Sequence, residues 1–340
     1  MRTKPLLPLG GKTMSNALLT VESLATYFPV KKGIFSRATH DIRAVDQVSF
    51  SIAPGEALGL VGESGCGKST LARTILMLEN AKQGNIVFED TDLLAAPPAQ
   101  VRRLRRNMQV VFQDPFASLN PGMTIMELIT EGLIVHGLID RTKRAEVAAS
   151  LLQEVGLDAD MANRFPHEFS GGQRQRICIA RAISTRPKLL ICDEAVSALD
   201  VSVQAQIMNL LMKLRKELNL AFLFISHDLG VVSHFCDRIA VMYLGKIVEM
   251  GTAQEIMNNP RHPYTKALLA AIPKVGTDKS ERLRLPGEIP SAKNPPPGCP
   301  FHPRCRFEID VCRTTPPTLQ PCENTVKHQA ACHRRNEPLQ

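Results

Sequence analysis

The sequence predicts an α/β fold in which a largely parallel sheet carries helices on its faces. Two observations support this prediction. Short uninterrupted apolar runs, at 57–61, 189–192 and 221–225, are typical of strands buried on both faces. These runs alternate with longer segments of helical periodicity, such as 171–185 and 202–219, and this order of elements is characteristic of α/β proteins.

The other elements follow from similar patterns. Segments 19–28 and 42–52 alternate apolar and polar residues, as half-buried strands do. A helix is expected over 69–78, directly after a glycine-rich loop. The remaining expectations, in chain order, are short strands over 84–90 and 108–113, a helical region over 120–165 and a final strand pair near 239–250.

Composition describes a globular protein. The chain has 340 residues, of which 44% are hydrophobic and 22% charged, so it can bury a sizeable core. No apolar stretch approaches the roughly 18 residues of a membrane span, and the N-terminus lacks the apolar run of a signal peptide. The formal charge of +8 would suit nucleic acid or an anionic membrane, but the basic runs are short and not interleaved with aromatic residues.

A glycine-rich loop joins the apolar run 57–61 to the helix expected next. Its sequence, Gly62-Glu63-Ser64-Gly65-Cys66-Gly67-Lys68-Ser69-Thr70, fits G-x-x-x-x-G-K-[ST]. Backbone N–H groups in such a loop, placed at a helix N-terminus, bind phosphate. Lys68 is expected to reach the β- and γ-phosphates of a nucleotide, and the Ser69 hydroxyl to coordinate Mg²⁺.

Two carboxylates follow the apolar run 189–192. Asp193 is expected to enter the magnesium shell beside Ser69, and Glu194 to polarise the attacking water as general base. The alternative is that these carboxylates cap the helix over 202–219, although Asp200 is better placed for a cap.

Two neutral side chains follow other strands of the predicted sheet. Gln113 ends the strand expected over 108–113, and its amide can contact both the metal and the water. His227 follows the apolar run 221–225 and can contact the γ-phosphate. Taken alone, Gln113 would be a surface residue and His227 a structural one.

The segment Phe169-Ser170-Gly171-Gly172-Gln173 precedes a basic helix. Together with the motifs above it resembles the motif set of ABC-type ATPases, over residues 19–255, with Phe169 where the family has leucine. The resemblance implies a P-loop NTPase cassette: a RecA-like mixed sheet core, an antiparallel β subdomain and a helical subdomain at about 114–183. The expected domains are a flexible N-terminus (1–18), a nucleotide-binding domain (19–258) and a cysteine-rich C-terminal extension (259–340).

The same resemblance implies that two cassettes enclose two ATP molecules. In the family, the segment corresponding to Ser170–Gln173 faces the phosphate loop of the opposite subunit, so Ser170, Gly171, Gly172 and Gln173 are expected to bind ATP held there. Asp200 resembles the residue that links the two sites across the dimer. Phe28 looks like the aromatic residue that stacks on adenine, with Tyr27 as the alternative.

Several segments resemble the oligopeptide/dipeptide/nickel importer branch of this family, namely 61–70, 113–121, 193–207 and 262–265. The insertion 31–35 looks like that of one of the branch's two paired ATPases. The resemblance implies a peripheral protein on the cytoplasmic side of the inner membrane, with a sister ATPase, two permease subunits and a solute-binding protein, that powers import of di- or oligopeptides.

Other roles remain open at this point. Glutathione, nickel-chelate, opine and antimicrobial-peptide systems share the branch. A soluble ABC ATPase acting on nucleic acid is the distant alternative. Repair ATPases of that kind insert a long coiled coil or a zinc module after the phosphate loop, whereas about 100 residues separate Thr70 from Ser170 here.

Five of the nine cysteines fall between residues 299 and 332, and in a chain without a secretion signal this crowding favours metal over disulfides. The branch resemblance implies a 4Fe–4S cluster on Cys299, Cys305, Cys312 and Cys332, with a tail that holds no metal as an alternative. Cys322 is extra to that pattern and is either a substitute ligand or a free thiol. Zinc is the other alternative, with His302, His328 and His333 nearby, although the cysteine spacing is unlike that of common zinc sites.

Overall fold

The computed structural model describes residues 17–31, 38–197, 199–272, 287–288, 290–323, 325 and 327–337. The expected flexible segment 1–18, apart from its last two residues, lies outside these ranges, and so does most of the insertion at 31–35. No helix in the described ranges combines the length and apolarity that a membrane crossing requires.

An eight-stranded mixed sheet forms the core, in the order β11-β12-β10-β9-β3-β8-β7-β6. The strands from β6 to β9 run parallel, and β10, β11 and β12 add to the β9 edge in antiparallel fashion. The strands are β3 (Ala57–Val61), β6 (Met108–Val111), β7 (Leu189–Asp193), β8 (Ala221–Ser226), β9 (Arg238–Tyr243), β10 (Lys246–Thr252), β11 (Gln320–Pro321) and β12 (Gln329–Ala330).

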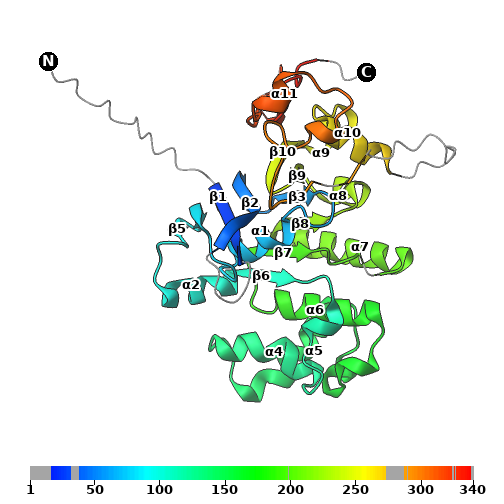
Figure 1. Ribbon diagram of the computed structural model, residues 1–340. Coiled ribbons are helices and arrows are strands. Elements are labelled where there is room, and N and C mark those ends of the chain that lie inside the picture. Colours follow the sequence, from blue (N-terminus) through cyan, green and yellow to red (C-terminus); the bar gives the residue numbers. More distant parts are fainter. Residues whose placement is uncertain are drawn as a thin grey trace.

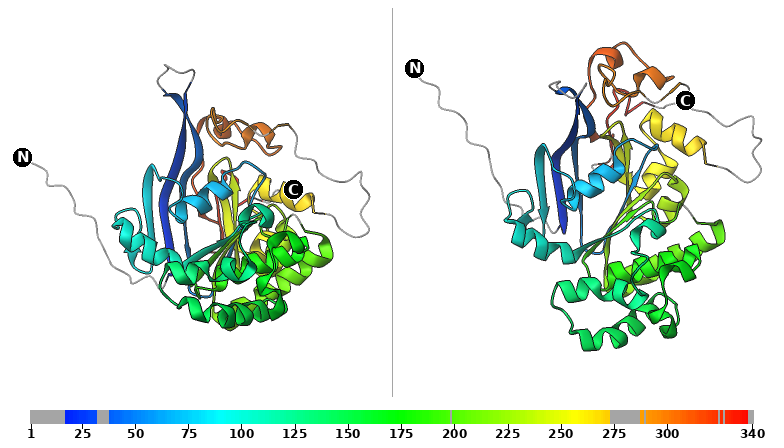
Figure 2. Two further views of the ribbon diagram at one scale, coloured as in Figure 1. Left: turned by 90° about the horizontal axis from the view of Figure 1, so that it is seen from below. Right: turned by 60° about the horizontal axis from the view of Figure 1, so that its bottom comes forward.

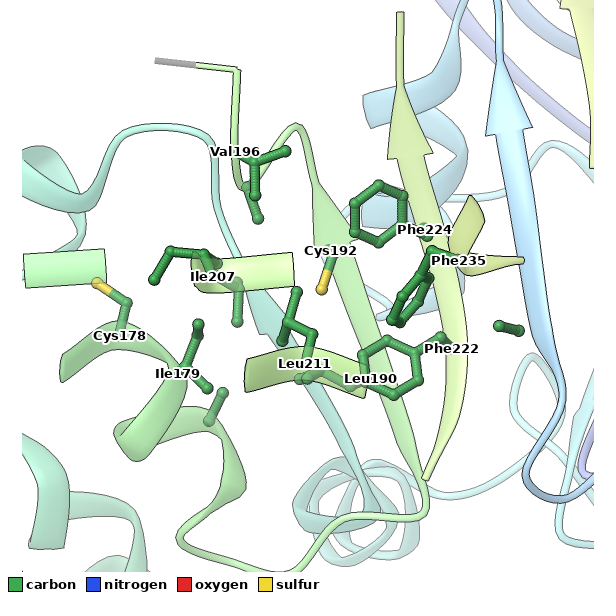
Figure 3. Close-up of a cluster of buried hydrophobic side chains, with 14 of the residues drawn as sticks. Cys178, Ile179, Leu190, Cys192, Val196, Ile207, Leu211, Phe222, Phe224 and Phe235 are labelled. Atoms are coloured by element: carbon green, nitrogen blue, oxygen red, sulfur yellow. The ribbon is translucent and has the colours of Figure 1, made fainter. Parts of the chain in front are cut away.

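The apolar runs lie in the centre of this sheet, as predicted. Every residue of β3, β7 and β8 is buried. Successive side chains alternate between the two faces, so Leu190 and Cys192 face one layer of helices while Leu189 and Ile191 face another core. Figure 3 shows the first of these cores, where Phe222, Phe224 and Phe235 gather beside Cys192, with Leu190 and Leu211 next to them.

A second sheet covers the other face of the first. It is antiparallel, in the order β2-β1-β4-β5. Helix α1 (Lys68–Ile75) lies between the sheets and buries Leu71 and Ile75 in their shared core. The strands are β1 (Leu19–Lys31), β2 (Ala38–Ile52), β4 (Gln83–Phe88) and β5 (Thr91–Asp92).

Helices between residues 115 and 183 form a separate region at one end of the molecule (Figure 1). Helix α4 begins with a complete capping box, in which Thr124 and Glu127 exchange hydrogen bonds. The helices here are α3 (Pro115–Ser118), α4 (Ile125–Val135), α5 (Arg144–Glu154) and α6 (Gly171–Ile183), and those elsewhere in the cassette are α2 (Pro98–Leu104), α7 (Val201–Leu218), α8 (Leu229–Phe235) and α9 (Ala253–Asn258).

The C-terminal segment lies at the opposite end from α4–α6, as Figures 1 and 2 show. It includes α10 (Pro263–Ala270), α11 (Val311–Thr314) and the strand β12, which pairs with β10. Glu249 of β10 is fully buried, and its carboxylate accepts hydrogen bonds from the N–H groups of Arg261 and His262 and contacts Nε2 of His328 at 2.7 Å. The segment is therefore joined to the cassette by sheet pairing and by a buried polar contact.

Candidate functional site

The glycine-rich loop lies between β3 and α1, where the sequence predicts a phosphate loop. Gly67 precedes α1 with φ of 109°, and a Cβ atom there would lie 1.9 Å from the carbonyl oxygen of Ala44. Only glycine fits this position without moving the backbone. Lys68 is buried, and its Nζ donates hydrogen bonds to the carbonyl oxygens of Gly62 and Glu63 at 2.8 and 3.1 Å.

A cavity of about 310 Å³ opens at this loop and at the ends of the neighbouring strands. Gln113 and Glu194 line it, and a second hollow that shares Ser64 with it also reaches His227. The predicted residues at the carboxyl ends of four strands therefore meet at one edge of the sheet, as parallel strands require. The residues lining the first cavity are Ile42, Arg43, Ala44, Ser64, Gly65, Cys66, Gly67, Lys68, Ser69, Thr70, Gln113, Glu194, Gly245 and Ala292.

Ser69 and Asp193 place two oxygen donors side by side. The Ser69 hydroxyl donates a hydrogen bond to Oδ1 of Asp193 over 2.9 Å. Burial raises the pKa of Asp193, while the hydrogen bond from Ser69 acts in the opposite direction and the charge of Glu194 adds to the increase. A hydroxyl and a carboxylate beside a phosphate site are the ligands that Mg²⁺ prefers, so this donor set fits the ion.

Glu194 lies at the centre of the site. Its carboxylate accepts a hydrogen bond from the Gln113 amide at 3.2 Å, and lies 3.5 Å from Nδ1 of His227 and 4.0 Å from Nζ of Lys68. Its backbone has a φ of 52°, which is rare for a residue with a side chain. Residues held in this region of backbone conformation are more frequent at functional sites than elsewhere. Gln113 itself lies two residues beyond the end of β6, so the strand is shorter than predicted.

The segment at 170–173 lies apart from this cavity within a single chain. Ser170 caps α6 through a capping box with Gln173, and both Ser170 and Gly171 are exposed. None of residues 170–173 belongs to the lining of either hollow, in the described part of the chain. Asp200 occupies the N-cap position of α7, but its side chain makes no capping hydrogen bond and is exposed.

The two aromatic candidates near the cavity differ in their contacts. The Tyr27 hydroxyl donates to Asp46 at 2.7 Å, and its ring faces the amine of Lys82. Burial and the contact with Asp46 raise the pKa of Tyr27 to about 12. Phe28 is half-buried and pairs with Ile42, which lines the cavity, although Phe28 itself does not line it. The Tyr27 side chain is therefore held by polar contacts, whereas the Phe28 ring carries no polar group and remains the better candidate for stacking on a nucleotide base.

The C-terminal cysteines approach one another. The N–H of Cys299 donates to the carbonyl of Cys312 at 2.8 Å. Burial is the main cause that raises the pKa of Cys299 to about 12. The hydrogen bond with the backbone of Phe301 acts in the opposite direction, and the charges of Cys312, Cys332 and Cys305 act with burial. Cys322 has different neighbours, and its N–H donates a hydrogen bond to the carbonyl of His328. Burial raises the pKa of Cys322 to about 11, and the charge of Glu249 adds to the increase.

The described residues nevertheless contain no group of three or more His, Cys, Asp and Glu side chains arranged to hold a metal ion. A zinc ion and a 4Fe–4S cluster both require three or four donors that face one point, so this arrangement of the described side chains shows neither site. The three candidate histidines also have other partners. His328 contacts Glu249, and ring nitrogens of His302 and His333 lie near the carbonyl oxygens of Cys299 and Thr315.

Sequence reasoning missed several residues that shape the site. Tyr264 and Arg304, both from the C-terminal segment, contact Glu63 of the phosphate loop, and Ala292 lines the cavity. The phosphate-loop pattern contains no signal for them, because they lie about 200 residues or more further along the chain.

Comparison with known proteins agrees with this geometry. The ABC transporter family matches residues 45–197, and the family described as "Oligopeptide/dipeptide transporter, C-terminal region" matches residues 248–312. The chain is 49% identical to the oligopeptide transport ATP-binding protein AppF of Bacillus subtilis (strain 168), over 93% of this chain and 97% of that protein. This chain belongs to the ABC transporter ATP-binding proteins.

A second relative and a solved structure lead to the same family. The chain is 47% identical to the dipeptide transport ATP-binding protein DppF of Escherichia coli (strain K12), over 91% of this chain and 92% of that one. Among solved structures the chain resembles the dimeric, post-hydrolysis structure of the ATP-binding cassette MJ0796 bound to ADP and Pi. The TM-score is 0.61 and the sequence identity 28%, and the match covers 69% of this chain and 98% of that chain. The predicted cassette fold is thereby confirmed.

Proposed function

We propose that this chain binds and hydrolyses ATP to power import of di- or oligopeptides through a membrane permease. The observation that carries the hydrolytic part is the position of Glu194, whose carboxylate lies between Gln113, His227 and the phosphate-loop lysine. The peptide cargo is supported by the names of relatives such as AppF and DppF, and by the family match of the C-terminal segment.

Each residue of the site has its own role in ATP binding or hydrolysis in this proposal. The backbone N–H groups of residues 62–70 and the amine of Lys68 bind the phosphates and hold the terminal one in place. Ser69 and Asp193 would hold Mg²⁺, which would neutralise the phosphate charge. Glu194 orients a water molecule and takes its proton, while Gln113 positions that carboxylate and His227 contacts the γ-phosphate. Phe28 stacks on the adenine.

The second half of the site belongs to another subunit in this proposal. Ser170, Gly171, Gly172 and Gln173 present the exposed N-terminus of α6, whose dipole and free N–H groups suit a phosphate. A sister ATPase supplies the corresponding segment to this chain's phosphate loop, and Asp200 lies at the contact between the two sites. Two permease subunits hold the pair at the cytoplasmic face of the inner membrane, and a solute-binding protein delivers the peptide.

Uptake measurements test the cargo. A strain that lacks the gene for this chain should lose uptake of labelled di- or oligopeptides and regain it with the wild-type gene, whereas Glu194→Gln should not restore it. Glutathione and nickel chelates, supplied to the same strains, are the alternative cargoes. Restored uptake of either one, with peptide uptake unchanged by the deletion, would contradict the peptide assignment.

We also propose that Cys299, Cys305, Cys312 and Cys332 hold a 4Fe–4S cluster. The backbone hydrogen bond from Cys299 to Cys312 supports the proposal, as does the donor set, since four thiolates are the usual ligands of such clusters. Protein purified without oxygen should be brown and contain iron and sulfide. Cys305→Ser should lose this colour, whereas Cys322→Ser should keep it. Colourless wild-type protein without iron would contradict the proposal.

A further inference from the structure

Glu63 of the phosphate loop is held from two directions. Within the loop, its carbonyl oxygen accepts a hydrogen bond from Nζ of Lys68 at 3.1 Å. From the C-terminal segment, Arg304 donates hydrogen bonds to both oxygens of the Glu63 carboxylate, at 2.8 and 3.0 Å. The N–H of Glu63 also donates to the Tyr264 hydroxyl at 2.8 Å. One residue therefore joins the phosphate-binding lysine to two residues of the C-terminal segment.

The pair between Arg304 and Glu63 differs from the surface ion pairs of this protein. The Arg304 side chain is only 4% exposed and that of Glu63 is 24% exposed. Two parallel hydrogen bonds between a guanidinium and a carboxylate are strong and fix the orientation of both groups. The hydrogen bonds to Glu63 raise the pKa of Arg304 further above its ordinary value. Loss of either partner would leave a largely buried charge without its counterion.

Packing of aromatic side chains fixes the position of Arg304. Its N–H donates to the carbonyl of Phe301 at 3.0 Å, within the turn that carries both residues. The Phe301 ring packs against Tyr243 and Tyr264, with centroids 5.3 and 5.5 Å away, and all three rings are buried. Tyr243 ends β9, and its hydroxyl lies 3.5 Å from Arg304. A continuous set of buried contacts thus connects the turn at 299–305 to the phosphate loop.

We propose that Arg304 is a positioning residue for nucleotide binding. By holding Glu63, it fixes the loop carbonyl that Lys68 contacts, and so the C-terminal segment sets the affinity of the phosphate loop for ATP. Ala292 of the same segment lines the cavity at that loop, which brings a second part of the segment to the nucleotide. The inference rests on the proposed function of the loop as the ATP site.

A double-mutant cycle tests this coupling. Arg304→Met, Glu63→Gln and the double variant are prepared as full-length proteins, and the dissociation constant of a fluorescent ATP analogue is measured on the folded protein. Each single change should weaken binding about fivefold or more, the lower end of typical coupling between sites. The double variant should be no weaker than the weaker single variant, because both changes remove the same contact.

Two further variants separate the possible outcomes. Arg313→Met removes an exposed arginine of the same segment. Arg313 pairs with Glu308, with 2.9 Å between Nε and Oε1, and contacts no residue of the phosphate loop in the described part of the chain, so this variant should bind the analogue as wild type does. Lys68→Ala tests the loop itself and should abolish binding. If Lys68→Ala binds normally, the proposed ATP site is wrong. If Lys68→Ala fails to bind while Arg304→Met binds as wild type does, only the positioning role is overturned.

The cycle also distinguishes positioning from a general loss of stability. A purely structural arginine would lower the melting temperature without changing the affinity of the folded protein, and that result would overturn the inference. Fully additive effects of Arg304→Met and Glu63→Gln would overturn it too, because Arg304 would then act without Glu63. If Arg304→Met does not fold, Glu63→Gln provides the test by itself, because this change leaves the C-terminal segment unaltered. Binding of the ATP analogue by Glu63→Gln with wild-type affinity would then contradict the proposal.

Discussion

The side-chain amide of Gln113 donates a hydrogen bond to the Glu194 carboxylate across 3.2 Å, and so joins the loop after β6 to the end of β7. Glu194→Gln preserves the size of the side chain and can still accept this hydrogen bond, but it cannot take a proton from water. We expect turnover to fall by about 10²–10⁴-fold, the usual contribution of a general base, with ATP affinity retained. Phosphate release and nucleotide binding, measured on one preparation, check this expectation.

A glutamate outside the site provides the control for this substitution. Glu217 lies exposed on α7 and forms a surface pair with Lys213 at 3.9 Å, so Glu217→Gln should hydrolyse ATP at the wild-type rate. Normal phosphate release by Glu194→Gln would show that Glu194 is not the general base and that another residue of the site acts in its place.

The contact between Ser69 and Asp193 leads to a prediction about magnesium. Asp193→Asn removes the charge of one expected ligand, so the Mg²⁺ concentration for half-maximal hydrolysis should rise by about tenfold or more, as for other changes around metal sites. A magnesium titration of ATPase activity measures this shift. Asp228→Asn is the matched control, because Asp228 caps α8 and asparagine caps equally well. Equal magnesium requirements in the two variants would contradict the assignment of Asp193.

The sequence could predict the strand-end residues of the site because a simple rule governs them. Buried apolar runs become neighbouring parallel strands, and the residues after each run then meet at one edge of the sheet. This rule accounts for the meeting of Lys68, Asp193, Glu194 and His227 at one edge of the sheet. Gln113 follows the same rule, although its strand ends two residues earlier than the apolar pattern indicated.

Other features could not be predicted in this way. Arg304 and Glu63 are 241 positions apart, and no periodicity or spacing connects a turn among cysteines to a phosphate loop. Strands β11 and β12 contain two residues each, too few to show alternation, and exist because they pair with one another and with β10. The short helix α2 was missed as well, since its few apolar residues set no clear period.

The exposed N-terminus of α6 leads to a prediction about assembly. Gly171→Asp adds a negative charge where we expect phosphate from the opposite subunit, while an acidic residue in the first helical turn favours the helix itself. The isolated chain should therefore fold and bind ATP at its own phosphate loop as wild type does. Hydrolysis by the assembled transporter should fall, because the charge repels the nucleotide held by the other subunit.

Gly122→Asp provides the control for this substitution, because Gly122 is exposed in the same helical region and lies in a loop before α4. Nucleotide affinity of the isolated chain and ATPase activity of the complex, measured for both variants, separate the two effects. A Gly171→Asp variant that loses ATP affinity as an isolated chain would place residue 171 at its own phosphate loop, against the two-subunit arrangement.

The buried imidazole of His262 predicts a pH dependence of stability. Burial lowers its pKa from 6.5 to about 4, although the charge of Glu249 acts in the opposite direction. Between these values the unfolded chain binds a proton that the folded chain does not. The free energy of unfolding contributed by this histidine is therefore complete above about pH 6.5 and is lost progressively as the pH falls toward 4, by about 2 kcal/mol at pH 5.

His262→Asn isolates this contribution from the other titrating groups. Nδ1 of His262 accepts the N–H of Tyr264 at 3.1 Å at the start of α10, and asparagine can accept the same hydrogen bond without binding a proton. Urea unfolding of both proteins at about pH 7.5 and pH 5 should show a loss of stability that is smaller in the variant by about 2 kcal/mol. The same loss in both proteins would mean that His262 does not become protonated on unfolding over this range, because every other group titrates alike in the two.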